Sequence, residues 1–176
     1  MSQSVKIKNT KDNLVNSAIK TFGEKGFWNT RVSDIVKNAG VAQGTFYLYF
    51  KSKEDCFRFI IKEIQEKILS EVNQADAIFE VCKIFLKETY ELKEIARIFL
   101  FEALCSGNEF FNLYISFKKE IQSILKKFCN EEIEVIFLTG FLRELVVQKI
   151  IFEKTNLTET IILLEKGLKK LKLLTE

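Results

Sequence analysis

Histidine and proline are both absent from this 176-residue sequence, and glycine occurs only seven times. Without imidazole there is no Ser-His or Cys-His nucleophile pair and no histidine ligand for a metal ion. Without proline, helices can continue uninterrupted, whereas a fold with many strands and tight turns would lack its usual turn residues. We therefore predict an all-α fold.

The sequence also lacks a metal-binding motif and a long apolar run. Its four cysteines are more than twenty residues apart and form no C-x-x-C pair, so we expect small buried hydrophobes, with no metal and no cofactor. No stretch reaches the roughly 18 consecutive apolar residues of a membrane span, and residues 1–13 lack the apolar core of a signal peptide. We expect a cytoplasmic protein with no membrane segment.

The net charge of +3 is small and unevenly distributed. Residues 1–55 contain nine Lys and Arg against five Asp and Glu, whereas the remainder contains eighteen against nineteen. A local basic excess suits phosphate binding. It is equally typical of a solvated charged face, so charge alone leaves both interpretations open.

The sequence between Thr30 and Phe50 has the spacing of two short helices joined by a tight turn. Apolar residues at helical spacing predict a helix that starts near Thr30 and stops at Gly40, and a second helix follows through the letters GTFYLYF. A short helix, a glycine-containing turn and another short helix together predict a helix-turn-helix. Ser52 then caps a further helix.

A first helix is expected to precede this motif. It is predicted to begin at Asn9 or Thr10, which can cap it, and to end at Gly26 in a left-handed conformation.

The second helix of a helix-turn-helix enters the major groove, and its amino end meets the base edges. Gln43 can pair with an adenine edge, Thr45 can contact a phosphate or a thymine methyl, and Gly44 lets the backbone approach. The residues expected at the groove are Ala42, Gln43, Gly44 and Thr45; those expected at phosphates are Thr30, Ser33, Tyr47, Tyr49 and Lys53. Tyr47 could equally be a core aromatic, as we expect for Phe46 and Phe50.

Residues 10–58 as a whole resemble the DNA-binding region of the TetR family of transcriptional regulators. The matching letters are AIKTFGEKGFWNT and DIVKNAGVAQGTFYLYFKSKED. The resemblance implies a helix-turn-helix domain at residues 1–51 that binds double-stranded DNA through the positions just named. Ala42 departs from the family's common serine, which removes a side-chain cap worth roughly 1 kcal/mol. Gln43 departs from its common lysine, and Arg31 is expected to replace that charge.

For residues 52–176 the resemblance implies a helical domain that binds an effector and forms the dimer. Helices are predicted near 75–91, 93–105, 109–129, 131–153 and 158–174, giving about nine in the chain. Aromatic stripes are usually core, but several together can line an apolar pocket with a few polar groups. The candidates for this pocket are Phe85, Thr89, Tyr90, Phe99, Glu102, Phe110, Tyr114, Phe137 and Phe141.

The last two predicted helices are the candidate dimer surface, because the first of them is apolar almost all round. Glycine inside a helix costs about 1 kcal/mol relative to alanine, so Gly140 and Gly167 indicate a close approach of backbones. That approach lies either between two subunits or within one, and the sequence leaves both open. The expected dimer contacts are Gly140, Arg143, Val147, Ile162 and Gly167.

These patterns favour a homodimeric repressor that leaves a palindromic operator when a small hydrophobic effector binds. One helix-turn-helix per chain reads too few base pairs for a unique site, and a two-fold dimer doubles them. A protein of the same fold that only sequesters small molecules is the alternative. An enzyme using the carboxylate of Glu102 is disfavoured, because no second catalytic group can be named, so we expect no enzyme.

Overall fold

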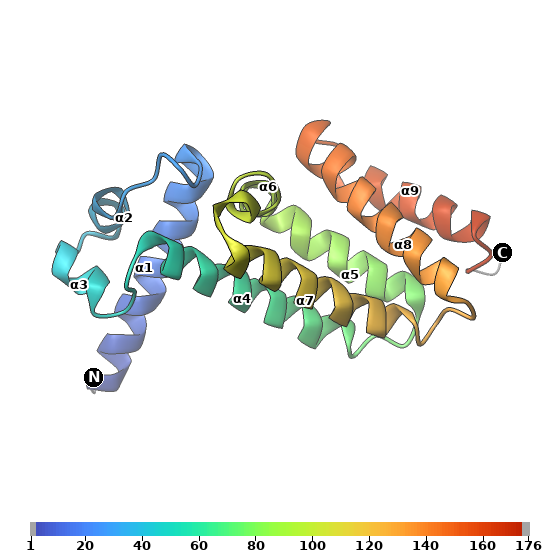
Figure 1. The fold of residues 1–176 in the computed structure, drawn as a ribbon, viewed down its shortest axis with the longest axis horizontal. Helices are drawn as coiled ribbons and strands as arrows, with labels where there is room; N and C mark the ends of the chain where they lie inside the picture. The colour runs from blue at the N-terminus through green and yellow to red at the C-terminus, as the bar shows by residue number, and fades with distance from the viewer. Residues whose placement is uncertain (1–2, 174–176) are drawn as a thin grey trace.

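The computed structural model describes residues 3–173, and in that range the chain forms nine α-helices and no strand (Figure 1). The predicted all-α class is confirmed. The elements are α1 (Gln3–Lys25), α2 (Val32–Ala39), α3 (Gln43–Tyr47), α4 (Lys53–Val72), α5 (Ile78–Glu91), α6 (Lys93–Phe101), the 3₁₀ turn η1 (Ala103–Ser106), α7 (Asn108–Leu125), α8 (Glu132–Glu144), the π-helical η2 (Leu145–Phe152) and α9 (Leu157–Lys170).

Two glycines and one serine set the boundaries of the amino-terminal helices as predicted. Gly26 ends α1 with a φ of 79°, and Gly40 ends α2 with a φ of 68°. Ser52 caps α4, because its side-chain oxygen accepts a hydrogen bond from the Asp55 N–H at 3.1 Å. These signals act over four residues or fewer, which is why they are readable in the sequence.

Two helices differ most from the prediction. The first begins at Gln3 instead of Asn9 or Thr10, because no glycine or proline stops it earlier. The helix predicted over 131–153 is continuous but changes from α to π hydrogen bonding at Leu145.

The interior contains two clusters of buried side chains, and α4 contributes to both. Phe57 and Ile60 belong to the cluster beneath α1–α3, whereas Ile68 and Val72 belong to the cluster among α5, α7, α8 and α9. Figure 1 shows α4 running from the α1–α3 group into the remaining bundle, with α8 and α9 at the opposite end. The domain boundary proposed between residues 51 and 52 therefore falls in the turn before a helix that both parts share.

None of the helices within residues 3–173 is both long and apolar enough to span a membrane. No group of three or more Cys, Asp or Glu in this range is placed to hold a metal ion.

Candidate DNA interface and effector cavity

The helix-turn-helix is held by apolar contacts on its inner side. Ile35 and Val36 of α2 and Phe46 of α3 are buried. In the turn between the helices, the Val41 N–H donates to the carbonyl of Val36 at 3.1 Å, and Gly40 takes the left-handed conformation that a side chain would strain. The outer faces of both helices are left free for another molecule.

The helices α2 and α3, which contain most of the residues predicted to contact DNA, lie at one end of the molecule (Figure 1). Thr45 and Tyr49 are half-buried. Ala42 precedes α3 without any side-chain cap, and the Thr45 N–H is held instead by the Ala42 carbonyl at 2.9 Å. The exposed members of the predicted set are Arg31, Ser33, Ala42, Gln43, Gly44 and Tyr47.

Thr30 is a correction to the predicted set. Its side chain is 1% exposed, and its hydroxyl donates to the carbonyl of Gly26 at 2.7 Å. The residue closes the loop that follows α1, so its hydroxyl points into the protein and cannot reach a phosphate. The prediction of a phosphate contact from Thr30 is wrong.

Lys53 is the second correction. Its ammonium group donates to three backbone carbonyls of the α1–α2 loop, those of Phe27 at 2.8 Å, Trp28 at 3.1 Å and Thr30 at 3.0 Å. An ammonium group has three N–H donors, and all three are used here. The first turn of α4 packs against this loop, so Lys53 secures the loop and has no donor left for a phosphate.

An ion pair fixes the start of α2. Lys25 lies 2.7 Å from one oxygen of Asp34, and the other oxygen accepts the Arg31 N–H at 3.0 Å. The hydrogen bond from Lys25, followed by the one from the Arg31 backbone, lowers the pKa of Asp34.

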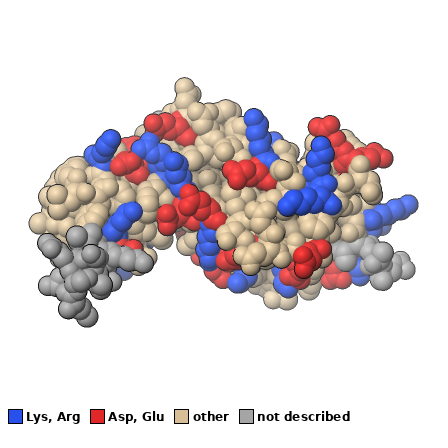
Figure 2. All heavy atoms as spheres, turned by 90° about the horizontal axis from the view of Figure 1, so that it is seen from below, with Lys and Arg blue, Asp and Glu red and all other residues tan. Residues whose placement is uncertain are grey.

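Figure 2 shows basic and acidic side chains interspersed over the face drawn, while the outermost end at α2 and α3 is mostly uncharged.

Trp28 is an interface candidate that the sequence reasoning missed. Its side chain is 59% exposed beside the buried Phe27, and the two rings meet edge to face at 5.5 Å. The available signal was the pair of adjacent aromatics after Gly26, because neighbouring residues in a turn rarely both face inward.

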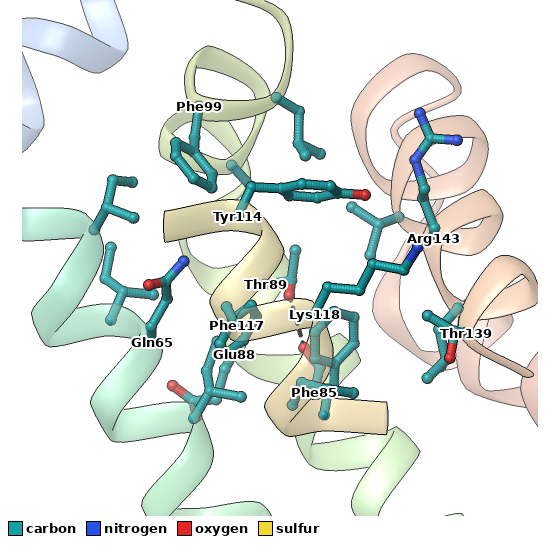
Figure 3. A pocket seen from close by; sticks show the side chains of 18 of the residues that line it. Gln65, Phe85, Glu88, Thr89, Phe99, Tyr114, Phe117, Lys118, Thr139 and Arg143 are labelled. Atoms are coloured by element: carbon teal, nitrogen blue, oxygen red, sulfur yellow. Dashed lines mark hydrogen bonds between the residues drawn. The ribbon is translucent and has the colours of Figure 1, made fainter. Parts of the chain in front are cut away.

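A cavity of about 620 Å³ lies among α4, α5, α6, α7 and α8 (Figure 3). This size is within the usual range of roughly 300–1,000 Å³ for small-molecule sites. Its wall is largely apolar. Four of the predicted pocket residues line it, namely Phe85, Thr89, Phe99 and Tyr114.

The other five predicted pocket residues lie elsewhere. Phe110 is buried in the amino-terminal core against Phe27 and Phe57, with ring centroids 5.8 Å apart in both pairs. Phe137 is 61% exposed on α8. Helical spacing identifies a shared face but not what that face packs against. The residues outside the cavity wall are Tyr90, Glu102, Phe110, Phe137 and Phe141.

Glu102 instead joins the carboxyl end of α6 to the α1–α2 loop. One carboxylate oxygen accepts the Phe27 N–H at 2.8 Å, and the other accepts a hydrogen bond from Arg97 at 3.2 Å. A side chain at Gly26 would lie 3.0 Å from the same carboxylate. Glu102 is thus a structural partner of the helix-turn-helix rather than a pocket residue.

Several polar residues of the cavity wall were not predicted from the sequence. Gln65 and Glu88 line its inner part, and Lys118 and Arg143 line its exposed part. Glu88 is 2% exposed and accepts a hydrogen bond from Lys67 at 2.5 Å, and this bond raises the pKa of Lys67. Glu88 could have been identified from the sequence, because it is an acidic residue that interrupts the apolar stripe of α5.

Comparison with known proteins identifies the family. Residues 14–60 match the family model for bacterial regulatory proteins of the tetR family. Residues 76–171, more than half of the chain, match the model for the tetracyclin repressor-like C-terminal domain. The chain belongs to the TetR family.

Individual relatives of this TetR-family chain agree with that assignment. A transcriptional regulator from Aquifex aeolicus VF5 is 34% identical, with a TM-score of 0.84 over 92% of this chain and 99% of that one. The uncharacterized HTH-type transcriptional regulator YvdT of Bacillus subtilis is 34% identical over 87 residues, which are 47% of this chain and 45% of YvdT. The chain thus spans less than half the length of the curated relatives it matches.

A more distant structure shares the fold. FadR from Bacillus subtilis, crystallised in complex with stearoyl-CoA, is 21% identical with a TM-score of 0.65, over 86% of this chain and 96% of FadR.

The five residues predicted to form the dimer contact lie in surroundings that differ from one another. A side chain at Gly167 would overlap the ring of Phe141, so this glycine serves a crossing of α9 and α8 within one subunit. Gly140 and Arg143 line the cavity. Val147 is half-buried, and Ile162 is exposed on α9. The dimer itself remains a prediction.

Proposed function

We propose that this chain is a ligand-responsive transcriptional regulator that binds double-stranded DNA as a homodimeric repressor in the cytoplasm. It leaves a palindromic operator when a small hydrophobic effector fills the cavity. One observation carries the proposal: a helix-turn-helix with a free outer face and an apolar cavity of about 620 Å³ share the helix α4. Membership of a family of regulators supports the DNA-binding part.

The amino end of α3 supplies the base contacts in this proposal. Gln43 is exposed there, and its amide can form a bidentate pair with an adenine edge. Gly44 adds no side chain between the backbone and the groove, and Thr45 follows it directly in the same turn. Two copies of α3 must lie roughly 34–36 Å apart to enter successive major grooves.

The dimer surface is proposed on the outer side of α8 and α9. Large apolar side chains are exposed there, with Phe137 at 61%, Ile133 at 49% and Ile162 at 45%. Several large exposed apolar side chains on two successive helices make this side the candidate for a protein contact.

Two charged side chains couple the cavity to the DNA-reading helices. The helix α4 lines the cavity from Ile61 to Ile68 and holds the α1–α2 loop through Lys53. The helix α6 lines the cavity through Phe99 and holds the same loop through Glu102. A shift of either helix therefore moves the loop that precedes α2. A coupling of about 1–3 kcal/mol would change operator affinity about 5–150-fold.

The apolar cavity wall and the ligand of FadR, a protein of the same fold, support an elongated apolar effector. The apolar part of the wall comes from isoleucine, leucine and phenylalanine side chains of five helices. FadR, which shares the fold, was crystallised with stearoyl-CoA, a ligand with a long acyl chain.

The test measures operator affinity with the cavity empty and filled. An operator is first selected from random duplexes, and compounds that raise the melting temperature of the protein are then added at saturation. Fluorescence anisotropy should show a 5–150-fold loss of operator affinity, within the usual range for allosteric coupling. Ligands that bind in the cavity yet leave operator affinity unchanged would refute the proposed coupling between effector binding and DNA binding. Ligand binding with no selectable operator would instead indicate a sequestering protein.

A further inference from the structure

The charges in the cavity wall are unevenly compensated. Glu88, the buried acidic residue, is paired with Lys67 at 2.5 Å and has Lys87 3.8 Å away. Lys118 of α7 and Arg143 of α8 line the exposed part of the cavity, and neither has an ion-pair or hydrogen-bond partner among the side chains that the structure describes, those of residues 10–105 and 107–173. The wall therefore offers two free positive charges, while its negative charge is already balanced.

The inner part of the cavity contains an unpaired polar group. The side-chain nitrogen of Gln65 is buried without a hydrogen-bond partner among the described residues. Two other polar side chains of the wall are satisfied within their own helices: the Thr89 hydroxyl donates to the Phe85 carbonyl at 2.8 Å, and the Thr139 hydroxyl donates to the Val135 carbonyl at 2.6 Å. A buried amide without a partner is costly, so a native site retains it when a ligand completes it.

The two features lie on opposite sides of the cavity. Figure 3 shows Gln65 on the α4 side and Arg143 on the α8 side, with Phe85, Phe117 and Tyr114 between them. An occupant that reaches both must be elongated, with an apolar middle and two polar ends. This geometry excludes a compact ligand with a single polar group as the best fit.

We propose that the effector is an amphipathic anion. Its carboxylate or phosphate lies between Lys118 and Arg143, its apolar chain fills the cavity, and a hydroxyl or carbonyl at its far end pairs with Gln65. The inference rests on the proposed function in that it assigns the chemistry of the same effector cavity. A cationic effector is disfavoured, because Glu88 already has its partners and Lys118 and Arg143 would repel it.

The charge of the head group is tested with three probes that share one alkyl chain: dodecanoate, dodecan-1-ol and dodecylammonium. Isothermal titration calorimetry of the full chain should show dodecanoate binding about tenfold more tightly than the alcohol, with the cation weakest. Equal affinities for the three probes, or a preference for the cation, would overturn the proposal.

The residues of the head-group site are tested by substitution. The double variant Lys118→Gln and Arg143→Gln should lose most of the preference for dodecanoate over dodecan-1-ol, a change of about tenfold for two partly exposed charges. Lys118→Gln alone should lose about threefold, and it remains informative if the Arg143 change disturbs assembly. The matched control is Lys119→Gln, which removes an exposed charge from the same helix outside the cavity wall. Equal effects of Lys118→Gln and Lys119→Gln would contradict the assignment.

The proposed pairing of Gln65 with the far end of the effector is tested with 12-hydroxydodecanoate. It should bind the unaltered protein about fivefold more tightly than dodecanoate, and this advantage should vanish in Gln65→Leu. An advantage that persists in Gln65→Leu would place the hydroxyl elsewhere and refute the pairing. These assays contain no DNA, so the head-group and far-end assignments can hold even if operator affinity proves insensitive to ligand, and in that case the proposed switch alone fails.

Discussion

Replacing Lys53 by methionine distinguishes a lysine that holds the fold from one that binds a phosphate. Methionine keeps most of the chain length but removes the three hydrogen bonds to the carbonyls of the α1–α2 loop, at 2.8, 3.0 and 3.1 Å. A hydrogen bond to a charged group contributes about 1.5–3 kcal/mol when buried. Because Lys53 is half-buried, water replaces part of what is lost, and the expected loss in the free energy of unfolding is about 2–4 kcal/mol.

Two measurements decide the role of Lys53. Urea unfolding gives the loss of stability, and the dependence of operator affinity on salt gives the number of phosphate contacts, at a slope of about −0.9 per contact. The structure predicts a less stable protein with an unchanged salt slope. The exposed neighbour Lys51, changed to methionine, should alter stability by no more than about 0.5 kcal/mol. The reasoning would be refuted by a Lys53→Met protein of normal stability whose salt slope of operator binding is weaker by about 1.8, which corresponds to one lost phosphate contact in each of two subunits.

Four further outcomes are expected. Glu102→Ala leaves a loop amide unpaired, so it should cost about 1–3 kcal/mol in urea unfolding and reduce the effect of a ligand on operator affinity. Gly167→Ala should lower the free energy of unfolding by about 1–3 kcal/mol, because the new methyl overlaps an aromatic ring of α8. The hydrogen bond from Lys25 lowers the pKa of Asp34, so the stability difference between Asp34→Asn and the unaltered protein should be present at neutral pH and be lost as the pH falls through this lowered pKa in pH-dependent unfolding. Cys105 is exposed, whereas burial raises the pKa of two other thiols to about 12, so a thiol reagent should modify Cys105 first, as peptide mapping would show.

The parts of the fold that could be predicted depend on short-range signals. Gly26 and Gly40 end helices because only a residue without a side chain adopts their backbone angles at no cost, and Ser52 starts a helix through a bond to a residue three positions on. Such effects need no knowledge of distant segments. The helix-turn-helix lies within one such stretch, so its two helices and the glycine turn between them could be predicted from the letters alone.

The roles that could not be predicted depend on packing between distant segments. Lys53 and Glu102 both hold the loop after α1, although one lies more than twenty residues away and the other more than seventy. Nothing in their neighbourhoods in the sequence indicates that partner. Phe110 and Phe117 are two turns apart on α7, yet one enters the amino-terminal core and the other lines the cavity. Which helix faces which decides such cases, and periodicity does not contain that information.

The most direct test of the account is selection of bound sequences from random double-stranded DNA at a stated salt concentration. The unaltered protein should enrich a palindrome whose half-sites lie about one helical turn apart. The double variant Gln43→Ala and Thr45→Ala should retain weak, salt-dependent binding but enrich no sequence, because only contacts with phosphates remain. Enrichment of the same palindrome by both proteins would contradict the claim that the amino end of α3 reads the bases.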